Sequence, residues 1–319
     1  MRRILIALVL ACAAFGATAQ PYPSKPLRFI VPVAAGGLTD ILTRLLATRL
    51  QERLGQSVVV DNRTGAGGII GMEGAAKSPA DGYTILMSYI GVAAVNPSLY
   101  KDLPYDTLRD FAPVSLVASF PMVLAVHPDV PAKTTKEFID LAKARPGTLL
   151  YGSAGNATTS HLAMELFRRE AGIDVSHVPY KGAAPALNDL MGGRLAAVFD
   201  SLTLIMPQAK AGRVRALGIA SRERSKLAPE IPTISEAGVK DFEVTGWYGV
   251  LVPAATPRSA VERLEAEFNA IVREPAMRDQ MLQRGIEPIG EGAGRFGQLL
   301  KSEIEKWRRV VQESKLKPD

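Results

Sequence analysis

Residues 32–54 read PVAAGGLTDILTRLLATRLQERL and join a predicted strand to a predicted helix. The apolar run at 27–33 predicts a buried strand, and from Leu38 to Leu54 apolar residues recur at helical spacing. Between them, Ala34 to Gly37 carry no side chain longer than a methyl group, so a bound group could approach the backbone closely. The first N–H groups of a helix lack helical partners and favour negative charge. The stretch therefore indicates an anion-binding turn, although a purely structural tight turn fits the same residues.

A second loop of similar chemistry occupies residues 151–161, YGSAGNATTSH. It also follows a predicted strand and precedes an amphipathic helix, and it has no formal charge if His161 is neutral. Its hydroxyls and its amide are possible helix caps or ligand donors. Two such loops in different parts of the chain predict a ligand gripped between two lobes. A carboxylate would be held there by backbone N–H groups and helix dipoles instead of by arginine.

Predicted strands and helices alternate, and their short connections favour parallel βαβ units. We predict strands at 27–33, 57–61, 83–88, 114–117, 122–127, 149–152, 175–179, 196–200, 214–220 and 248–252. We predict helices at 38–54, 68–77, 134–144, 159–171, 185–191 and from 204, a loop through Asn96-Pro97, and two or three helices after residue 252. This pattern predicts two α/β lobes and two crossings that form a hinge. We expect lobe 1 to comprise residues 20–124 plus 248–319, and lobe 2 residues 125–247.

The N-terminus has the pattern of a secretory signal peptide. Two arginines precede an apolar segment that is too short to span a bilayer, and Ala17-Thr18-Ala19 forms a cleavage site, so we expect residues 1–19 to be removed. A lipoprotein cleavage site at Cys12 is the alternative. Cys12 is the only cysteine, so we expect neither disulfide nor thiol chemistry in the mature chain. No later stretch approaches eighteen apolar residues.

Composition and charge indicate a globular protein that does not bind nucleic acid. With 319 residues, 47% hydrophobic and 22% charged, the chain can bury a core large enough for two domains. Removing Arg2 and Arg3 lowers Lys+Arg from 38 to 36 against 32 acidic residues, a net charge of +4. The basic residues are scattered and are not interleaved with aromatics, so we expect no nucleic-acid partner.

Several motifs in fixed order resemble the extracytoplasmic solute receptors of the tripartite tricarboxylate transporter family, often called Bug proteins. They are PSKP (23–26), VDNR (60–63), GAGG (65–68), DGYT (81–84), NPSLY (96–100) and VPYKG (178–182), and the likeness extends from about Tyr22 to the C-terminus. The resemblance implies a two-lobed type II periplasmic-binding-protein fold of the α/β class. Each lobe would be a mostly parallel sheet flanked by helices, with two crossover strands forming the hinge. It also implies a periplasmic monomer that binds a small carboxylate and delivers it to a membrane permease of one large and one small subunit.

By position, the resemblance also assigns ligand-binding residues. In the first loop these are Ala35, Gly36, Gly37, Leu38, Thr39 and Asp40, and in the second loop Ser153, Gly155, Asn156, Ala157, Thr158, Thr159 and His161. Ser88, Tyr180, Lys181 and Asp200 complete the set around the cleft. The chain departs from the family pattern at Val33 and Leu38, which leaves the contacts that set specificity open.

Some of these side chains have structural interpretations as well. Asp40 could complement the helix dipole in the first turn or could pair with a ligand ammonium. Asp200, at a strand end, could cap a loop or contact the ligand. A structural hydrogen bond is the simpler role for His161, and Lys181 could be an ordinary surface lysine.

The alternative classes are an enzyme and a sensor. Tyr151 stands where a G-x-S-x-G nucleophile elbow needs glycine, and residues 65–71 miss the dinucleotide-binding pattern by one position. There is no Walker A sequence, and the three histidines lack metal-ligand spacing. A Ser-His-Asp set from Ser153 or Ser160, His161 and Asp200 is the one enzymatic constellation that sequence alone leaves open. We expect no enzyme, cofactor or metal; a sensor that presents its ligand to a membrane receptor would use the same cleft.

Overall fold

The computed structural model describes residues 22–156 and 158–313. The predicted signal peptide, residues 1–19, and the predicted ligand residue Ala157 lie outside the described residues. Within the described ranges, no helix combines the length and apolar composition needed to cross a bilayer.

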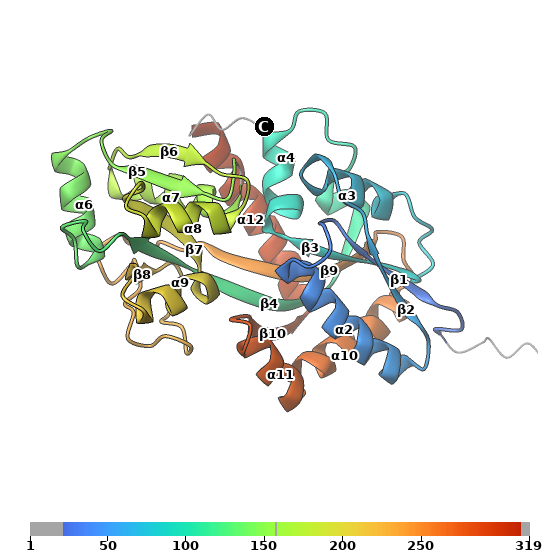
Figure 1. The fold of residues 1–319 in the computed structure, drawn as a ribbon. Helices are drawn as coiled ribbons and strands as arrows, with labels where there is room; N and C mark the ends of the chain where they lie inside the picture. The colour runs from blue at the N-terminus through green and yellow to red at the C-terminus, as the bar shows by residue number, and fades with distance from the viewer. Residues whose placement is uncertain (1–21, 157, 314–319) are drawn as a thin grey trace, which may run out of the picture.

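A mixed ten-stranded sheet extends through both halves of the molecule (Figure 1). Its strands are β1 (Leu27–Val31), β2 (Val58–Asn62), β3 (Thr84–Tyr89), β4 (Phe111–Val126), β5 (Leu150–Ser153), β6 (Ser176–Pro179), β7 (Ala197–Ser201), β8 (Arg215–Ile219), β9 (Thr245–Pro253) and β10 (Glu287–Gly292). The order is β2-β1-β3-β9-β4-β7-β5-β6, and β8 and β10 pair with β4. Pairing is parallel at the two ends and antiparallel around β4 and β9, so each end has the predicted βαβ character.

Strand β4 connects the two halves of the sheet. From Phe111 to Pro121 it pairs with β9, and from Met122 to Val126 it pairs with β7 and β8. The prediction of two separate strands, 114–117 and 122–127, is therefore wrong. Proline within a strand removes a donor from the ladder, but here a register shift absorbs Pro113, and Pro121 lies where the partner strand changes. The residue bounds of the two lobes remain a prediction.

The helices cover both faces of the sheet (Figure 1). They are α2 (Leu38–Leu54), α3 (Ile69–Ala76), α4 (Asn96–Leu99), α5 (Thr107–Asp110), α6 (Thr135–Ala144), α7 (Thr159–Ala171), α8 (Ala183–Met191), α9 (Leu202–Lys210), α10 (Arg258–Arg273), α11 (Pro275–Leu282) and α12 (Ala293–Glu313), with short helical turns η2 (Ala66–Gly68) and η3 (Gly91–Val95). The core forms on both sides of the sheet, and α12 packs against β4, η3 and α4.

Two local predictions differ from the structure. The predicted loop through Asn96-Pro97 is helical, because η3 runs directly into α4 and Pro97 lies in the first turn, where proline is tolerated. Val92 to Val95 are all fully buried, so this segment lacks the polar face from which helical periodicity is read. Strand β10 was not predicted, because its sequence EPIGEG contains proline and two glycines and its pairing with β4 is bulged.

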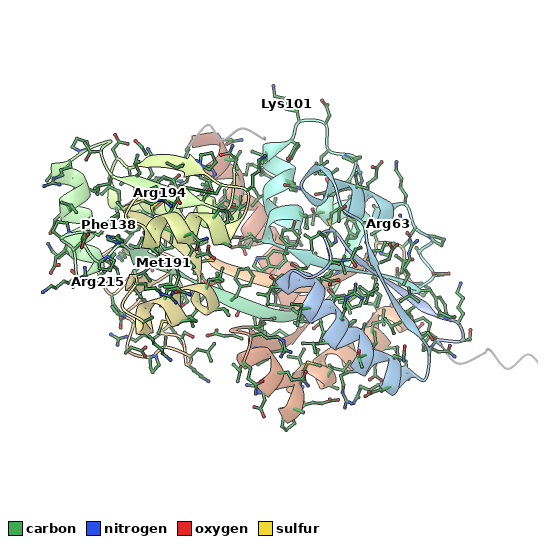
Figure 2. All side chains as sticks on the ribbon, viewed as in Figure 1. Arg63, Lys101, Phe138, Met191, Arg194 and Arg215 are labelled. Atoms are coloured by element: carbon green, nitrogen blue, oxygen red, sulfur yellow. The ribbon has the colours of Figure 1, made fainter. Side chains whose placement is uncertain are left out.

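The charged side chains project from both halves of the molecule (Figure 2). Arg63 and Lys101 lie on one half and Arg194 on the other. Arg63 is 2.9 Å from Asp61, and Arg194 is 2.5 Å from Asp189. Such ion pairs near the surface contribute little stability. The two pairs lie on different halves of the molecule, in agreement with the scattered basic residues of the sequence.

Candidate functional site

The first predicted ligand loop is an exposed turn held in shape by Asp40. Ala34 to Gly37 are exposed, and Gly36 has a φ of +88°, in the region that favours glycine. The Gly36 backbone N–H donates to Asp40 Oδ2 at 2.9 Å. Arg44 Nε and Asn62 Nδ2 also donate to this carboxylate, at 3.0 and 2.9 Å. Asp40 is only 2% exposed, so its carboxylate is occupied by donors from the protein.

These contacts set the electrostatics of Asp40. Burial alone would raise its pKa, but the hydrogen bonds from Arg44, Gly36 and Asn62 outweigh burial and hold the pKa below its usual range. The carboxylate is therefore ionised at neutral pH and shapes the turn before α2. The geometry favours the structural interpretation of Asp40 over a direct contact with a ligand ammonium.

The second predicted loop is braced by hydroxyls and by the neighbouring strand end. Thr158 Oγ1 donates to the Gly155 carbonyl at 2.7 Å, and Ser160 Oγ accepts from the Ala154 N–H at 2.9 Å. The N–H groups of Tyr180 and Gly182 donate to the carbonyls of Ser153 and Ala154. The segment at Tyr180 therefore supports the loop through its backbone.

A stack of rings lies behind this loop. Ser153 Oγ is 2.6 Å from His177 Nε2, and the rings of His177 and His161 stack with centroids 4.0 Å apart. His161 is 5% exposed and Ser153 is 1% exposed, so both are buried behind the loop. The histidine that Ser153 contacts is His177, which is not part of the Ser-His-Asp set considered from sequence, and Asp200 accepts a hydrogen bond from the Ser201 N–H.

One pocket of about 350 Å³ brings the two loops together. It is lined by Leu38, Phe120, Met122, Ala154, Thr158, Thr159, Ser160, Asp200, Ser201, Thr203 and Leu204. Leu38 comes from the start of α2, Thr159 from the start of α7, and Asp200 from the end of β7. The pocket thus lies at the junction of the two halves of the sheet, where β4 changes its partner strand.

The other predicted ligand-binding residues that the structure describes do not line this pocket. Ala35, Gly36 and Gly37 form the exposed turn before Leu38, while Thr39 is buried behind it. Gly155 and Asn156 belong to the second loop, half-buried. Ser88 is fully buried, and its hydroxyl donates to the Gly249 carbonyl between β3 and β9. Tyr180 Oη donates to Asp189, and Lys181 is exposed; neither side chain lines the pocket.

Several lining residues were not predicted. Phe120 and Met122 come from the crossover strand, and Ser201, Thr203 and Leu204 from the beginning of α9. Ala154 and Ser160 lie between residues that were named. The sequence holds only a weak signal for Phe120 and Met122. They are two residues apart where the predicted strand 122–127 begins, and an extended chain would place both on one face.

Asp200 is the one charged residue among the described residues that line this pocket. It is 8% exposed, and the Ser201 N–H donates to its Oδ1 at 2.7 Å. Burial raises the pKa of Asp200 to about 6, although the hydrogen bonds from Ser201 act in the opposite direction. At neutral pH the group is therefore mostly ionised within an otherwise uncharged pocket.

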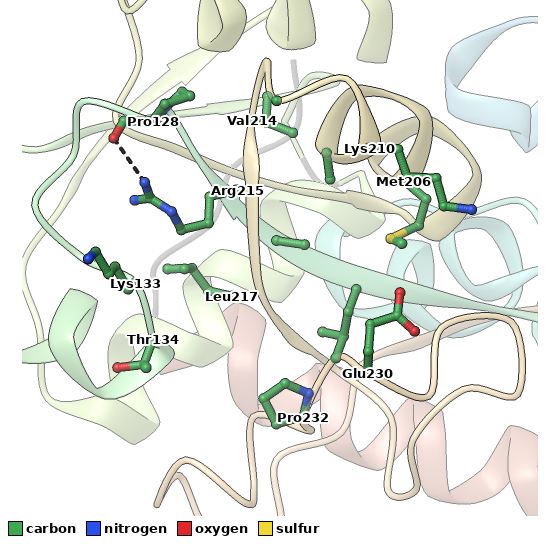
Figure 3. Close-up of a pocket in the computed structure, with 14 residues that line it drawn as sticks. Pro128, Lys133, Thr134, Met206, Lys210, Val214, Arg215, Leu217, Glu230 and Pro232 are labelled. Carbon is green, nitrogen blue, oxygen red and sulfur yellow. Dashed lines mark hydrogen bonds between the residues drawn. The ribbon is translucent and has the colours of Figure 1, made fainter.

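Two larger hollows lie elsewhere. One, of about 650 Å³, lies between β8, the end of α9 and the loop before α6 (Figure 3). Its Arg215 is directed at backbone carbonyls, including that of Pro128 at 3.2 Å, so this guanidinium is already used (Figure 3). The other, of about 820 Å³, follows α12. Neither is lined by the two predicted loops, and no group of three or more metal-ligating side chains gathers in the described part of the chain.

Comparisons with known proteins identify relatives over nearly the whole chain. A family described as "Tripartite tricarboxylate transporter family receptor" matches residues 42–316. A UPF0065 protein from the tcbD-tcbE intergenic region of Pseudomonas sp. (strain P51) is 41% identical and covers 99% of this chain and 95% of its own length. Protein BugT of Bordetella pertussis is 36% identical and covers 98% of both chains.

Solved structures agree with this. The Rhodopseudomonas palustris protein Rpa4515, solved with adipate, is 36% identical with a TM-score of 0.81, covering 93% of this chain and 100% of that one. MatC from Rhodopseudomonas palustris, solved with bound malate, is 30% identical with a TM-score of 0.76, covering 91% of this chain and 100% of that one. These likenesses confirm the two-lobed periplasmic-binding-protein fold.

Proposed function

Because the chain belongs to the tripartite tricarboxylate transporter receptor family, whose members are periplasmic solute-binding proteins and not enzymes, we propose that it captures a small carboxylate between its lobes. It then delivers the carboxylate, unchanged, to a membrane permease of one large and one small subunit. The mature protein acts as a periplasmic monomer after removal of residues 1–19.

The observation that carries this proposal is a pocket to which both strand-to-helix loops contribute. Helices α2 and α7 both begin at this pocket, with 17 and 13 residues respectively. The first N–H groups of each helix have no helical acceptor, and each helix dipole favours an anion there. A carboxylate between the two helix starts would be bound without an arginine.

The expected affinity is compatible with a transport receptor. About six hydrogen bonds to a charged oxygen, at roughly 1.5 to 3 kcal/mol each, give on the order of 9 to 18 kcal/mol gross. Association and ordering oppose binding by about 4 to 15 kcal/mol. Micromolar or somewhat tighter binding, about −8 kcal/mol, is within this range.

Different predicted residues have different roles in this proposal. The backbone from Ala35 to Asp40 and from Ser153 to Thr159 forms the carboxylate cradle, and Asp200 faces the bound molecule. His161, Tyr180, Lys181 and Ser88 act around the cleft and do not touch the ligand through their side chains. The adipate and malate bound by two relatives support small carboxylates as the ligand class.

Native mass spectrometry of gently purified mature protein tests the proposal. A small carboxylate released intact on denaturation, at one per chain, and rebinding at micromolar or better affinity in calorimetry is the expected result. A protein that releases nothing and binds no member of a broad carboxylate panel would overturn it. Chemical conversion of the ligand during incubation would also contradict the proposal.

A further inference from the structure

Among the residues that the structure describes, the pocket to which both loops contribute carries negative charge and no positive charge. Of its eleven lining residues, four carry large apolar side chains (Leu38, Phe120, Met122 and Leu204), and Asp200 alone carries a charge. No lysine, arginine or histidine is among these eleven described residues. A second carboxylate on a ligand would therefore meet no cation in the pocket and would face an acid.

The hydroxyls of the pocket are largely used within the protein. Thr158 Oγ1 donates to the Gly155 carbonyl, Ser160 Oγ accepts from Ala154, and Thr203 Oγ1 donates to the Arg284 carbonyl. Thr159 and Ser201 supply the remaining hydroxyls of the lining. Only a small polar part of the lining is therefore left to bind a ligand.

Asp200 differs from the other buried acid of the cleft region, Asp40. Asp40 receives hydrogen bonds from a backbone N–H, an arginine and an asparagine. Asp200 is bonded to its neighbour Ser201, and no ion pair involves it in the part of the chain that the structure describes. Burying an ionisable carboxylate without a cation is costly, so a cationic partner from outside the protein would stabilise it.

We propose that Asp200 sets the ligand class of this receptor: one carboxylate bound at the helix starts, an apolar middle, and a distal ammonium or other hydrogen-bond donor that meets Asp200. This inference rests on the proposed function, which it deepens. Leu38, Phe120, Met122 and Leu204 cover the apolar middle of the ligand. Matched dicarboxylates are rejected, because their second charge is buried beside Asp200.

The size of the pocket makes this discrimination strong. If treated as a sphere, a volume of 350 Å³ is about 9 Å across, close to the Debye length of about 8 Å at physiological salt. A bound ligand therefore lies within about one Debye length of Asp200, where screening by salt is incomplete. Two charges 4 Å apart interact by several kcal/mol at an intermediate dielectric constant, and we expect at least about a tenfold difference in Kd between matched ligands.

The test uses probes of equal chain length that differ only at the distal end. These are hexanoate, adipate and 6-aminohexanoate, together with butanoate, succinate and 4-aminobutanoate. Calorimetric Kd values are measured for the wild type, for Asp200→Asn, and for Asp140→Asn, an exposed acid on α6 that serves as the control.

In the wild type and in Asp140→Asn, we expect the amino acid of each series to bind most tightly and the dicarboxylate at least about tenfold more weakly than the monocarboxylate. In Asp200→Asn, we expect the amino acid to lose part of its affinity advantage over the monocarboxylate, and the dicarboxylate to bind more tightly than it does to the wild type. A wild type that prefers the dicarboxylate, or a ranking that Asp200→Asn leaves unchanged, overturns this inference and leaves the proposed function standing. If neither these probes nor a released molecule shows any carboxylate binding, the proposed function fails and the inference fails with it.

Discussion

Gly36 and Asp40 are linked by a hydrogen bond of 2.9 Å from the glycine N–H to the aspartate carboxylate, across the turn that begins α2. The acid reaches back over its own helix start, in the manner of the acidic residue of a capping box. Arg44 donates to the same carboxylate oxygen, and Asn62 donates to the other one. The shape of the first predicted ligand loop therefore depends on a side chain that does not line the pocket.

Replacing Asp40 by asparagine should loosen this loop. The variant keeps the side-chain volume but loses the charge that accepts from Arg44, so we expect the unfolding free energy at pH 7 to fall by about 1 to 2 kcal/mol. Carboxylate affinity should weaken as well, because the turn is no longer fixed. Asp140→Asn, which removes an exposed pair with Lys136, should cost less than about 0.5 kcal/mol.

The pH dependence of this effect has a definite sign. The folded pKa of Asp40 lies below its unfolded value, so its stabilisation is present above the unfolded pKa, about 4, and is lost as pH falls through the folded pKa. Urea unfolding of wild type and Asp40→Asn should therefore converge in strong acid. Equal stabilities at pH 7 would contradict the structural role of Asp40.

A second prediction concerns Gly37, the residue that caps α2. A Cβ at this position would lie 3.9 Å from the Ala34 carbonyl oxygen, and φ is −78°. Gly37→Ala should therefore fold and bind, with a loss of affinity below about tenfold for a methyl group at a cradle that remains open. Gly37→Asp should fold equally well but abolish carboxylate binding, because it places a negative charge where the ligand anion would bind. Unchanged affinity of Gly37→Asp in calorimetry would refute the loop assignment.

The features that sequence predicts here are local ones. An apolar run, a few small residues and an amphipathic repeat can be recognised within about 25 residues, and this pattern located the starts of both α2 and α7. A structural role for Asp40 at the helix start could be read in this way, but its contact with Asn62 could not, because Asn62 lies 22 residues further along the chain. Similarly, Phe120 lines the pocket because β4 changes its partner strand next to it. This pairing depends on strands distant in the sequence.

Buried helices were harder to predict than amphipathic ones. The segment from Val92 to Val95 has no polar face, so its helical structure left no periodic pattern in the sequence. In contrast, the buried positions of α12 recur at helical spacing over 21 residues, and this helix is among the two or three predicted after residue 252. The sequence therefore predicted the two-lobed plan and the two loops, while the pocket walls depend on contacts distant in the chain.

A third prediction follows from the raised pKa of Asp200. Because the folded pKa is about 6 and the unfolded value is 3.8, the folded state binds more protons between these values, so stability falls as pH rises through this window. Asp200→Asn removes this cost. We expect the ligand-free variant to be more stable than wild type by about 1 to 3 kcal/mol at pH 7 and nearly equal at pH 4. A destabilised variant at pH 7 would show that Asp200 is held by contacts within the protein.

The last prediction concerns the glycine beneath the crossover aromatic. Gly246 pairs with Phe120 in the β4–β9 register, and a Cβ on Gly246 would lie 2.0 Å from the Phe120 ring. Phe120 lines the proposed ligand pocket, so Gly246→Ala must displace a wall of this pocket. We expect about a tenfold loss of carboxylate affinity together with about 1 to 2 kcal/mol of stability.

Gly249→Ala provides the matched control for this effect. Its Cβ would lie 2.1 Å from the ring of Phe296, which is fully buried and does not line the pocket. This variant should lose stability to a similar or greater extent, while the folded protein keeps its affinity. The double variant Gly246→Ala with Phe120→Leu should recover part of the lost affinity, since the two changes couple through one contact. If both glycine variants weakened binding equally, the Phe120 contact would not be the cause, and a general loosening of the crossover strands would explain the loss.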